Sequence, residues 1–169
     1  MWGNEPFRLC YNLFMKEYRD FREFYNKSLE LTKLALSRTL NKKDAILYAR
    51  KNFNKSDLKS YYKIGQLKKA QTKLINTKTT EINFSIDSLI KNILEHPDLS
   101  FDDYNKISVI LKTADDIILG TYNHLRFFKI INEKLYEVIV KSTNDNHENF
   151  LLSLHRSDLS KLRNLKLKR

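Results

Sequence analysis

Apolar residues recur every three or four positions along most of the chain, a spacing that places them on one face of an α-helix. The first such stretch runs to about Leu36. Two shorter stretches follow, with Ile46, Ala49 and Phe53 in the second helix and Leu67, Ala70 and Leu74 in the third. The pattern predicts successive helices separated by short polar segments, of which 76–85 is the clearest linker.

Short polar side chains precede the predicted helices and supply N-caps, because their oxygens accept hydrogen bonds from the first free backbone N–H groups. The candidate caps are Asn4, Asn41, Ser56, Ser85 and Ser100. An aspartate follows both Asn41 and Ser100 at the third position, which resembles a capping box. The helix that begins after Ser85 is expected to end before Pro97.

The C-terminal half is also predicted to be helical. One long helix is expected over 101–141, with Gly120 marking a kink or a close packing contact. The polar stretch 142–149 interrupts the pattern. A last amphipathic helix is expected to contain Phe150, Leu154 and Leu162.

The composition supports a helical protein. The 169 residues include three glycines and two prolines, whereas sandwiches, barrels and dinucleotide-binding folds need many turn glycines. The single cysteine, Cys10, excludes a disulfide within the chain and is expected to be a small core residue. Because no apolar run reaches the roughly 20 residues that span a bilayer, no transmembrane segment is expected. The fold class predicted from the sequence is therefore all-α.

The net charge of +11 is concentrated in one part of the chain. Between Arg38 and Lys78 there are twelve basic and two acidic residues, so this segment carries +10 of the total. A second basic cluster, KLRNLKLKR, closes the sequence. Such clusters attract an anionic partner, which can be a nucleic acid, a membrane surface or an acidic protein.

No sequence motif indicates catalysis, and no enzymatic activity is predicted. Three scattered glycines cannot form a phosphate-binding loop. The four histidines do not have zinc-ligand spacing, so no metal site is predicted. The adjacent carboxylates at 102–103 and 115–116 are interpreted as a helix cap and a solvated helix face.

Two aromatic-containing segments resemble the LYR family of small mitochondrial adaptors. Phe24-Tyr25-Asn26 stands where the family has a Leu-Tyr-Arg signature, with Phe and Asn replacing its Leu and Arg. The segment 50–55, RKNFNK, is similar to the family's Arg-x-x-Phe-Arg-x-Asn segment, and 66–74 looks like its third helix. In a rival register Tyr11 is the signature tyrosine. The Tyr25 register is preferred because its distance from Phe53 is similar to the family's.

The resemblance implies an antiparallel three-helix bundle that clasps a mitochondrial acyl carrier protein. The acidic recognition helix of the carrier would lie on a basic face formed by Arg38, Lys42, Lys43, Arg50 and Lys51. No cofactor would be bound directly. The carrier's 4′-phosphopantetheine-linked acyl chain would enter a tunnel, with about 0.8 kcal/mol for each buried CH₂. The implied lining residues are Tyr25, Leu29, Ile46, Phe53, Leu67 and Leu74.

The chain is thus predicted to have an N-terminal helical extension (1–20), an LYR-like bundle (21–78) and a long-helix C-terminal extension (82–169). The implied function is that of a non-enzymatic adaptor or accessory subunit in the mitochondrial matrix or on the matrix side of the inner membrane. It would support a respiratory-chain complex, the iron–sulfur cluster machinery or the mitoribosome. The alternative is a basic helical RNA-binding subunit of a mitochondrial ribonucleoprotein, because Tyr48, Tyr61 and Tyr62 are interleaved with basic residues and could stack on bases.

Overall fold

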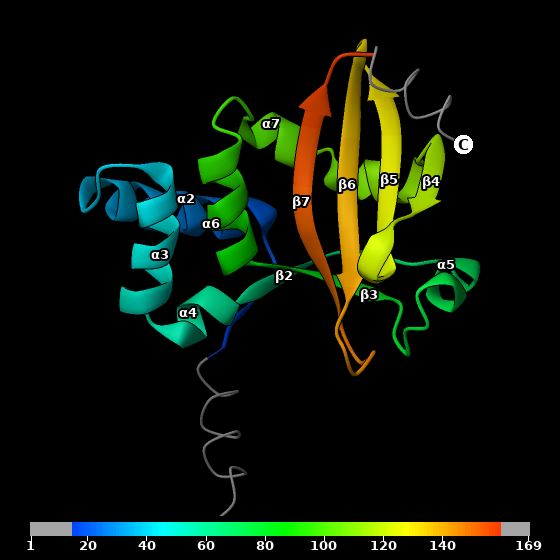
Figure 1. Cartoon of the computed structure of the whole chain (residues 1–169), viewed down its shortest axis with the longest axis horizontal. Coiled ribbons are helices and arrows are strands. Elements are labelled where there is room, and N and C mark those ends of the chain that lie inside the picture. Colours follow the sequence, from blue (N-terminus) through cyan, green and yellow to red (C-terminus); the bar gives the residue numbers. More distant parts are fainter. Residues whose placement is uncertain (1–14, 160–169) are drawn as a thin grey trace, which may run out of the picture. The chain divides into compact units, whose positions relative to one another are not determined.

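The computed structural model describes residues 15–159 and shows a mixed α/β fold (Figure 1). The helices are α2 (Phe21–Ser37), α3 (Lys42–Asn52), α4 (Lys55–Lys59), α5 (Lys69–Leu74), α6 (Ile86–Glu95), α7 (Phe101–Tyr104) and α8 (Ile107–Thr113), with a 3-10 turn η1 (Thr121–Asn123). The strands are β1 (Glu17–Tyr18), β2 (Tyr61–Gln66), β3 (Glu81–Ser85), β4 (Asp116–Leu119), β5 (His124–Ile131), β6 (Lys134–Ser142) and β7 (Asn149–Ser157). They form a seven-stranded sheet in the order β1-β2-β3-β7-β6-β5-β4.

This sheet shows that the predicted all-α class is wrong. The LYR-like three-helix bundle is not formed, because the expected third helix is replaced by the end of β2 and the six-residue helix α5. The expected long helix over 101–141 is two short helices followed by β4, β5 and most of β6. The segment from β4 to β7 is rich in Ile, Val, Phe and Leu. Such residues fit a pleated sheet as well as a helix face, so their spacing alone misassigned them.

Several sequence predictions fall outside the described residues. These are the Asn4 cap, the environment of Cys10, the rival Tyr11 register, most of the N-terminal extension and the basic cluster that begins at Lys161. Within residues 15–159, no helix is long and apolar enough to cross a membrane.

The described chain divides into two compact units. Unit 1 contains the described residues up to Lys63 together with Phe84–Pro97. Unit 2 contains Ile64–Asn83 and the described residues from Asp98 onward. This division differs from the predicted segments 1–20, 21–78 and 82–169, because 84–97 belongs with the N-terminal helices and 64–83 with the C-terminal strands.

Unit 1 is built around helix α2, which packs against α3 and α6. Its core contains an aromatic cluster centred on Phe24, which is fully buried. The ring of Phe24 lies 5.6 Å from that of Phe84 and 6.0 Å from that of Tyr62. The two alanines of α3, Ala45 and Ala49, are buried and allow close approach of the helices.

Most predicted N-caps in the described chain are confirmed. Asn41 Oδ1 accepts a hydrogen bond from the N–H of Asp44 at 2.9 Å, and Ser85 Oγ accepts one from the N–H of Ser88 at 3.1 Å. Ser100 and Asp103 form a reciprocal capping box at the start of α7. The predicted cap at Ser56 is wrong, because Asn54 caps α4 and Ser56 lies inside that helix. Local capping chemistry was therefore predicted better than the length of the helices.

The main body of unit 2 is the antiparallel meander β4-β5-β6-β7, to which β3 adds in parallel beside β7. A two-residue turn joins β5 to β6, and both of its residues, Asn132 and Glu133, have positive φ angles of 49° and 65°. Positive φ at both central positions matches the right-handed twist of the flanking strands. This turn places Ile131 opposite Lys134 and fixes the register of the hairpin.

One buried ionic cluster ties α7 to the sheet. The hydroxyl of Tyr136 in β6 donates to Asp103 Oδ1 at 2.6 Å, and Arg156 Nη1 in β7 donates to Asp103 Oδ2 at 2.9 Å. Burial tends to raise the pKa of Asp103, but hydrogen bonds from Ser100 and Tyr136 and the charge of Arg156 outweigh it, so its pKa is lowered. Burial, together with the hydrogen bond to Asp103 and its charge, raises the pKa of Tyr136 to about 12.

Replacing Asp103 with Asn is expected to reduce the free energy of unfolding by about 2 kcal/mol at pH 7, because Arg156 loses its buried partner. A carboxylate with a lowered folded-state pKa stabilises the fold above its ordinary pKa and loses that contribution as the pH falls through the folded value. The difference between wild type and Asp103→Asn should therefore shrink on acidification below pH 3.8, the ordinary value. Urea unfolding at several pH values measures both effects.

The matched control is Asp102→Asn, because Asp102 lies on the same short helix and is exposed. It should change the free energy of unfolding by less than about 0.5 kcal/mol. Equal losses in the two variants, or a loss in Asp103→Asn that does not vary with pH, would contradict this account of the cluster.

Candidate functional site: the open face of the β5–β7 sheet

The two faces of the β5-β6-β7 sheet differ in character. Directly paired residues of neighbouring strands share a face. On one face, Phe127, Val138 and Leu154 are fully buried, and helix α8 contacts β5 and β6. The strands β5, β6 and β7 lie side by side in Figure 1. The opposite face carries charged and polar side chains together with the buried apolar residues Phe128 and Leu135, and it is called the open face below.

The strand register arranges the open face in three rows that cross β5, β6 and β7 in this order. They are Phe128-Glu137-His155, Arg126-Ile139-Ser153 and His124-Lys141-Phe150. Most of these residues are half-buried, so their side chains are partly accessible while their positions are held by the sheet, whereas Phe128 and Glu137 are buried. Two imidazoles, one carboxylate and two cations are thus brought onto one rigid surface by residues far apart in the sequence.

Arg126 and Glu137 form a short ion pair on the open face. Arg126 Nη2 and Nε lie 2.6 Å and 2.9 Å from Glu137 Oε2, and the Glu137 side chain is 5% exposed. The guanidinium also lies over the ring of Phe128, 5.2 Å from its centroid. A buried carboxylate is stable only when it is paired, and the ring restricts the guanidinium further. The Arg126 side chain is nevertheless 29% exposed, so it can still meet an anion.

His155 lies directly opposite Glu137 on the neighbouring strand. Its Nε2 is 3.0 Å from Ser153 Oγ, a hydrogen bond whose direction depends on the tautomer. Cross-strand neighbours have Cβ atoms about 5 Å apart, which is within reach for a shared ligand or proton. The row therefore combines a carboxylate, an imidazole and, through the ion pair, a guanidinium.

The second histidine of the open face, His124, lies beside a cation, whereas His155 lies beside a carboxylate. It is paired with Lys141 across β5 and β6. Burial, and secondarily the charge of Lys141, lowers the pKa of His124 below its ordinary value of 6.5. The imidazole is therefore mostly neutral at pH 7 and can accept a proton or a hydrogen bond.

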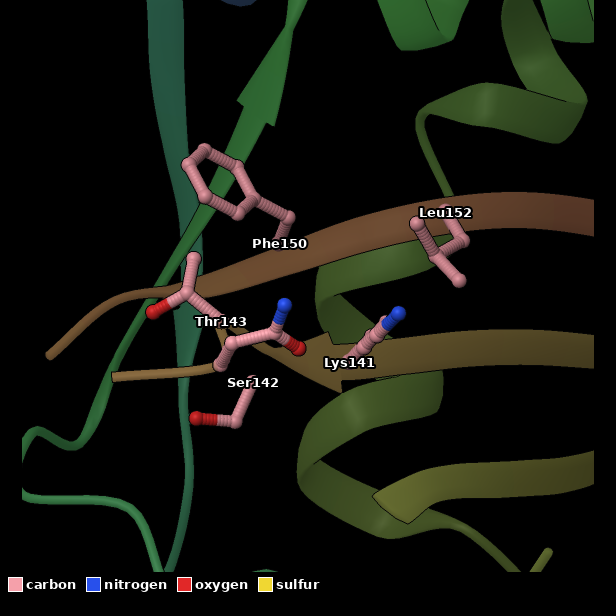
Figure 2. A pocket seen from close by; sticks show the side chains of 6 residues that line it. Lys141, Ser142, Thr143, Phe150 and Leu152 are labelled. Atoms are coloured by element: carbon pink, nitrogen blue, oxygen red, sulfur yellow. The ribbon is translucent and has the colours of Figure 1, made fainter. Parts of the chain in front are cut away.

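A pocket of about 320 Å³ adjoins the row that contains Lys141. Its lining residues are Lys141, Ser142, Thr143, Asn144, Phe150 and Leu152. Figure 2 shows Phe150 and Leu152 projecting from β7 beside Lys141, Ser142 and Thr143. The register shifts between Ile139 and Val140, so Leu152 is an extra residue in β7 without a direct partner. Such a bulge re-aims side chains locally, here beside the pocket.

The basic residues predicted to bind a carrier protein lie in unit 1, and all are exposed. Arg38 is the C-cap of α2, Lys42 and Lys43 begin α3, and Arg50 and Lys51 end it. Arg50 is engaged by Asp87 of α6 through two hydrogen bonds of 3.2 Å. The five basic residues are therefore distributed along α3 and the turn that precedes it.

The predicted tunnel residues are divided between the two units. Tyr25 and Leu29 lie on α2, Ile46 on α3 and Phe53 at the C-cap of α3, all in unit 1. Leu67 follows β2 and is buried in unit 2, whereas Leu74 at the end of α5 is 51% exposed. The structure thus brings Tyr25 and Leu29 together on one helix, but it does not form the three-helix bundle for which the set was chosen.

The carboxylate pairs noted in the sequence have structural partners. Asp103 belongs to the cluster with Tyr136 and Arg156. Asp115 Oδ1 lies 3.6 Å from Lys129 Nζ, and its Oδ2 accepts from the backbone of Ile130. Within the described residues, no group of three or more His, Cys, Asp or Glu side chains is placed to hold a metal ion.

The sequence analysis did not single out Glu137, His155, Arg126 or Lys141 as site residues. The available signal was partial: if 135–141 is read as a strand, Glu137 and Lys141 fall on the face opposite Val138 and Val140, although Ile139 lies between them on their own face. This strand pattern indicates a sheet with charged residues on one face. It was overlooked because the same segments also satisfy helical spacing.

Comparison with known proteins does not identify the chain. No protein-family model matches it, and no curated protein or solved structure is significantly similar. The LYR resemblance thus gains no support from these comparisons. Function has to be argued from the open face itself.

Replacing Lys141 with Ala is expected to raise the pKa of His124, because the neighbouring positive charge disfavours the imidazolium. The pKa should remain below 6.5, since burial is the larger cause of the shift and persists in the variant. Titration of the imidazole C–H resonances by NMR measures this directly. Lys134→Ala, at the exposed start of β6, is the control and should leave His124 unchanged. A His124 pKa that does not respond to Lys141→Ala would show that the two side chains do not interact.

Proposed function

We propose that the open face of unit 2 binds RNA and cleaves its phosphodiester bonds by general acid–base catalysis. The observation that carries the proposal is the row in which His155 lies opposite Glu137 while Arg126 is bonded to the same carboxylate. A carboxylate, an imidazole and a guanidinium at one place supply a proton acceptor, a proton donor and a phosphate ligand.

RNA carries its own nucleophile, so the protein has to move protons and stabilise charge. A base removes the proton of the 2′-hydroxyl, and the 2′-oxygen attacks the adjacent phosphorus. An acid gives a proton to the departing 5′-oxygen, which leaves a 2′,3′-cyclic phosphate and a 5′-hydroxyl. Glu137 and His155 are assigned as the acid–base pair. Arg126 is assigned to the non-bridging phosphate oxygens, where negative charge develops.

The remaining polar residues of the open face fit the same task. Lys141 can hold a neighbouring phosphate as a point charge, and His124 beside it is mostly neutral and able to accept a hydrogen bond. Neither residue needs to move far, because both lie on paired strands rather than on loops.

The charge of the whole chain favours a polyanionic substrate. The net charge is +11, and the basic residues of α3 are exposed. Long-range attraction of this kind raises the association rate with nucleic acid independently of base sequence. It also makes binding strongly dependent on salt concentration.

This proposal develops the RNA-binding alternative of the sequence analysis and departs from its expectation of a non-enzymatic protein. The adaptor function and the mitochondrial location stay predictions. The adaptor function relied on a three-helix bundle, and the described fold does not contain it. The tunnel and the carrier's acyl chain therefore have no structural argument in their favour.

Glu137→Gln and His155→Ala are each expected to lower the rate of RNA cleavage by about 100-fold or more, the usual contribution of a general acid or base. The assay uses a single-stranded RNA labelled at both ends, with the cyclic phosphate product identified by mass spectrometry. An RNA with one 2′-deoxy residue should resist cleavage after that residue, because the nucleophile is missing.

The matched controls are Glu133→Gln and His147→Ala, because both side chains are exposed and neither residue belongs to the three rows. They should retain wild-type cleavage. The proposal is wrong if the wild-type chain does not cleave RNA, or if Glu137→Gln and His155→Ala, shown to be folded by thermal unfolding, cleave at the wild-type rate.

A further inference from the structure

We infer that the pocket beside Lys141 is a nucleobase subsite, in which the ring of Phe150 stacks on a base next to the cleaved phosphate. The inference rests on the proposed function, because it names the part of the substrate that this pocket takes. The pocket lies at the end of the open face and shares Lys141 with it.

The size of the pocket suits one base. Its volume of about 320 Å³ is at the lower end of the range of about 300–1,000 Å³ that is usual for small-molecule sites. A planar base with part of its ribose fits such a volume, whereas a larger folded ligand does not. One of its lining residues, Lys141, also belongs to the open face (Figure 2).

The lining has the mixture of groups that base recognition requires. Phe150 and Leu152 provide an apolar surface from β7, and Phe150 is half-buried, so part of its ring is accessible. Aromatic side chains bind bases of single strands by stacking, whatever the sequence. Lys141, directly opposite Phe150, supplies a cation at the place where the phosphate of the same nucleotide would lie.

The polar side of the pocket is formed by the start of the β6–β7 loop. Thr143 Oγ1 is bonded to Asp145 Oδ1 at 2.5 Å and accepts from the N–H of Glu148 at 3.2 Å, so the loop holds its own shape. Asn144 between them is exposed. An amide offers both a donor and an acceptor, which is the pairing found on the edges of bases.

The position along the strand agrees with a substrate that spans both sites. Lys141 is four residues beyond Glu137 in β6, which corresponds to roughly 13 Å at the usual rise of a strand. This separation is on the scale of a dinucleotide. The substrate would then extend along the strands, with one phosphate bound by Arg126 and the base of the next nucleotide stacked on Phe150.

The test compares intact RNA with an RNA that lacks a single base. The full chain is assayed with a short single-stranded RNA that carries one cleavable linkage, the other sugars being 2′-deoxy, and with versions that are abasic on either side of that linkage. Phe150→Leu should weaken binding of the intact RNA by about tenfold, the typical effect of losing one stacked base. The same substitution should not change the affinity for the RNA that lacks the base bound in the pocket.

Phe150→Trp should restore binding, because an indole also stacks. Val109→Ala is the control, because Val109 is an exposed apolar residue of helix α8 and does not belong to the open face. This variant should bind both RNAs as the wild type does. The inference fails if Phe150→Leu weakens the intact RNA and every abasic RNA equally, or weakens none of them.

Failure of the proposed function gives a different result. In that case the wild-type chain does not cleave the linkage, or it cleaves it without Glu137 and His155. A titration with mononucleotides, read from NMR shifts of Phe150 and Thr143, then reports the pocket independently. Shifts at these residues would support a nucleotide pocket without catalysis, whereas their absence together with failed stacking would overturn the inference.

Discussion

The alternation of side chains in β5, β6 and β7 is the constraint on which unit 2 depends. Burial of Phe127, Val138 and Leu154 fixes which face of each strand turns inward. Every residue between them is then forced onto the opposite face. A slip of one residue would exchange the faces of Arg126 and Phe127, so the hydrophobic core and the three rows are two consequences of one register.

The same register buries a carboxylate, which costs free energy, and a neighbouring cation offsets that cost. Glu137 is buried on a sheet face, and a buried carboxylate without a partner would destabilise the fold by several kcal/mol. Arg126, held against the ring of Phe128, supplies the partner. On the other face, the carboxylate of Asp103 is likewise paired, because it accepts hydrogen bonds from Tyr136 and Arg156. Residues 155 and 156 of β7 therefore point to opposite faces, one to a candidate catalytic row and one to a structural cluster.

The sequence predicted local features of the fold better than its class. The caps at Asn41, Ser85 and Ser100 were recognised, because capping depends on residues three positions apart. Helices α2, α3 and α6 were also anticipated. The sheet was missed because FFKII and YEVIV are compatible with either helical or strand spacing, and only pairing between distant strands decides between them. The turn at Asn132 and Glu133 lacks the glycine that usually reveals a tight hairpin.

The candidate site was beyond sequence reasoning for a related reason. Glu137 and His155 are directly paired although 18 positions separate them, and no short motif links them. The charge excess, in contrast, was visible at once, and it led to a search for function on the exposed basic helices. The basic residues of α3 are indeed exposed, but the side chains suited to chemistry lie on the sheet.

The most direct test of this account is to map RNA binding residue by residue in solution. A uniformly ¹⁵N-labelled full chain would be titrated with a 2′-O-methyl RNA oligonucleotide, which binds as RNA does but lacks the nucleophilic hydroxyl. The account predicts that the largest amide shifts occur in β5, β6 and β7 and at the start of the β6–β7 loop. Shifts confined to α2 and α3, with the strands unchanged, would contradict it and return the functional surface to the basic helices.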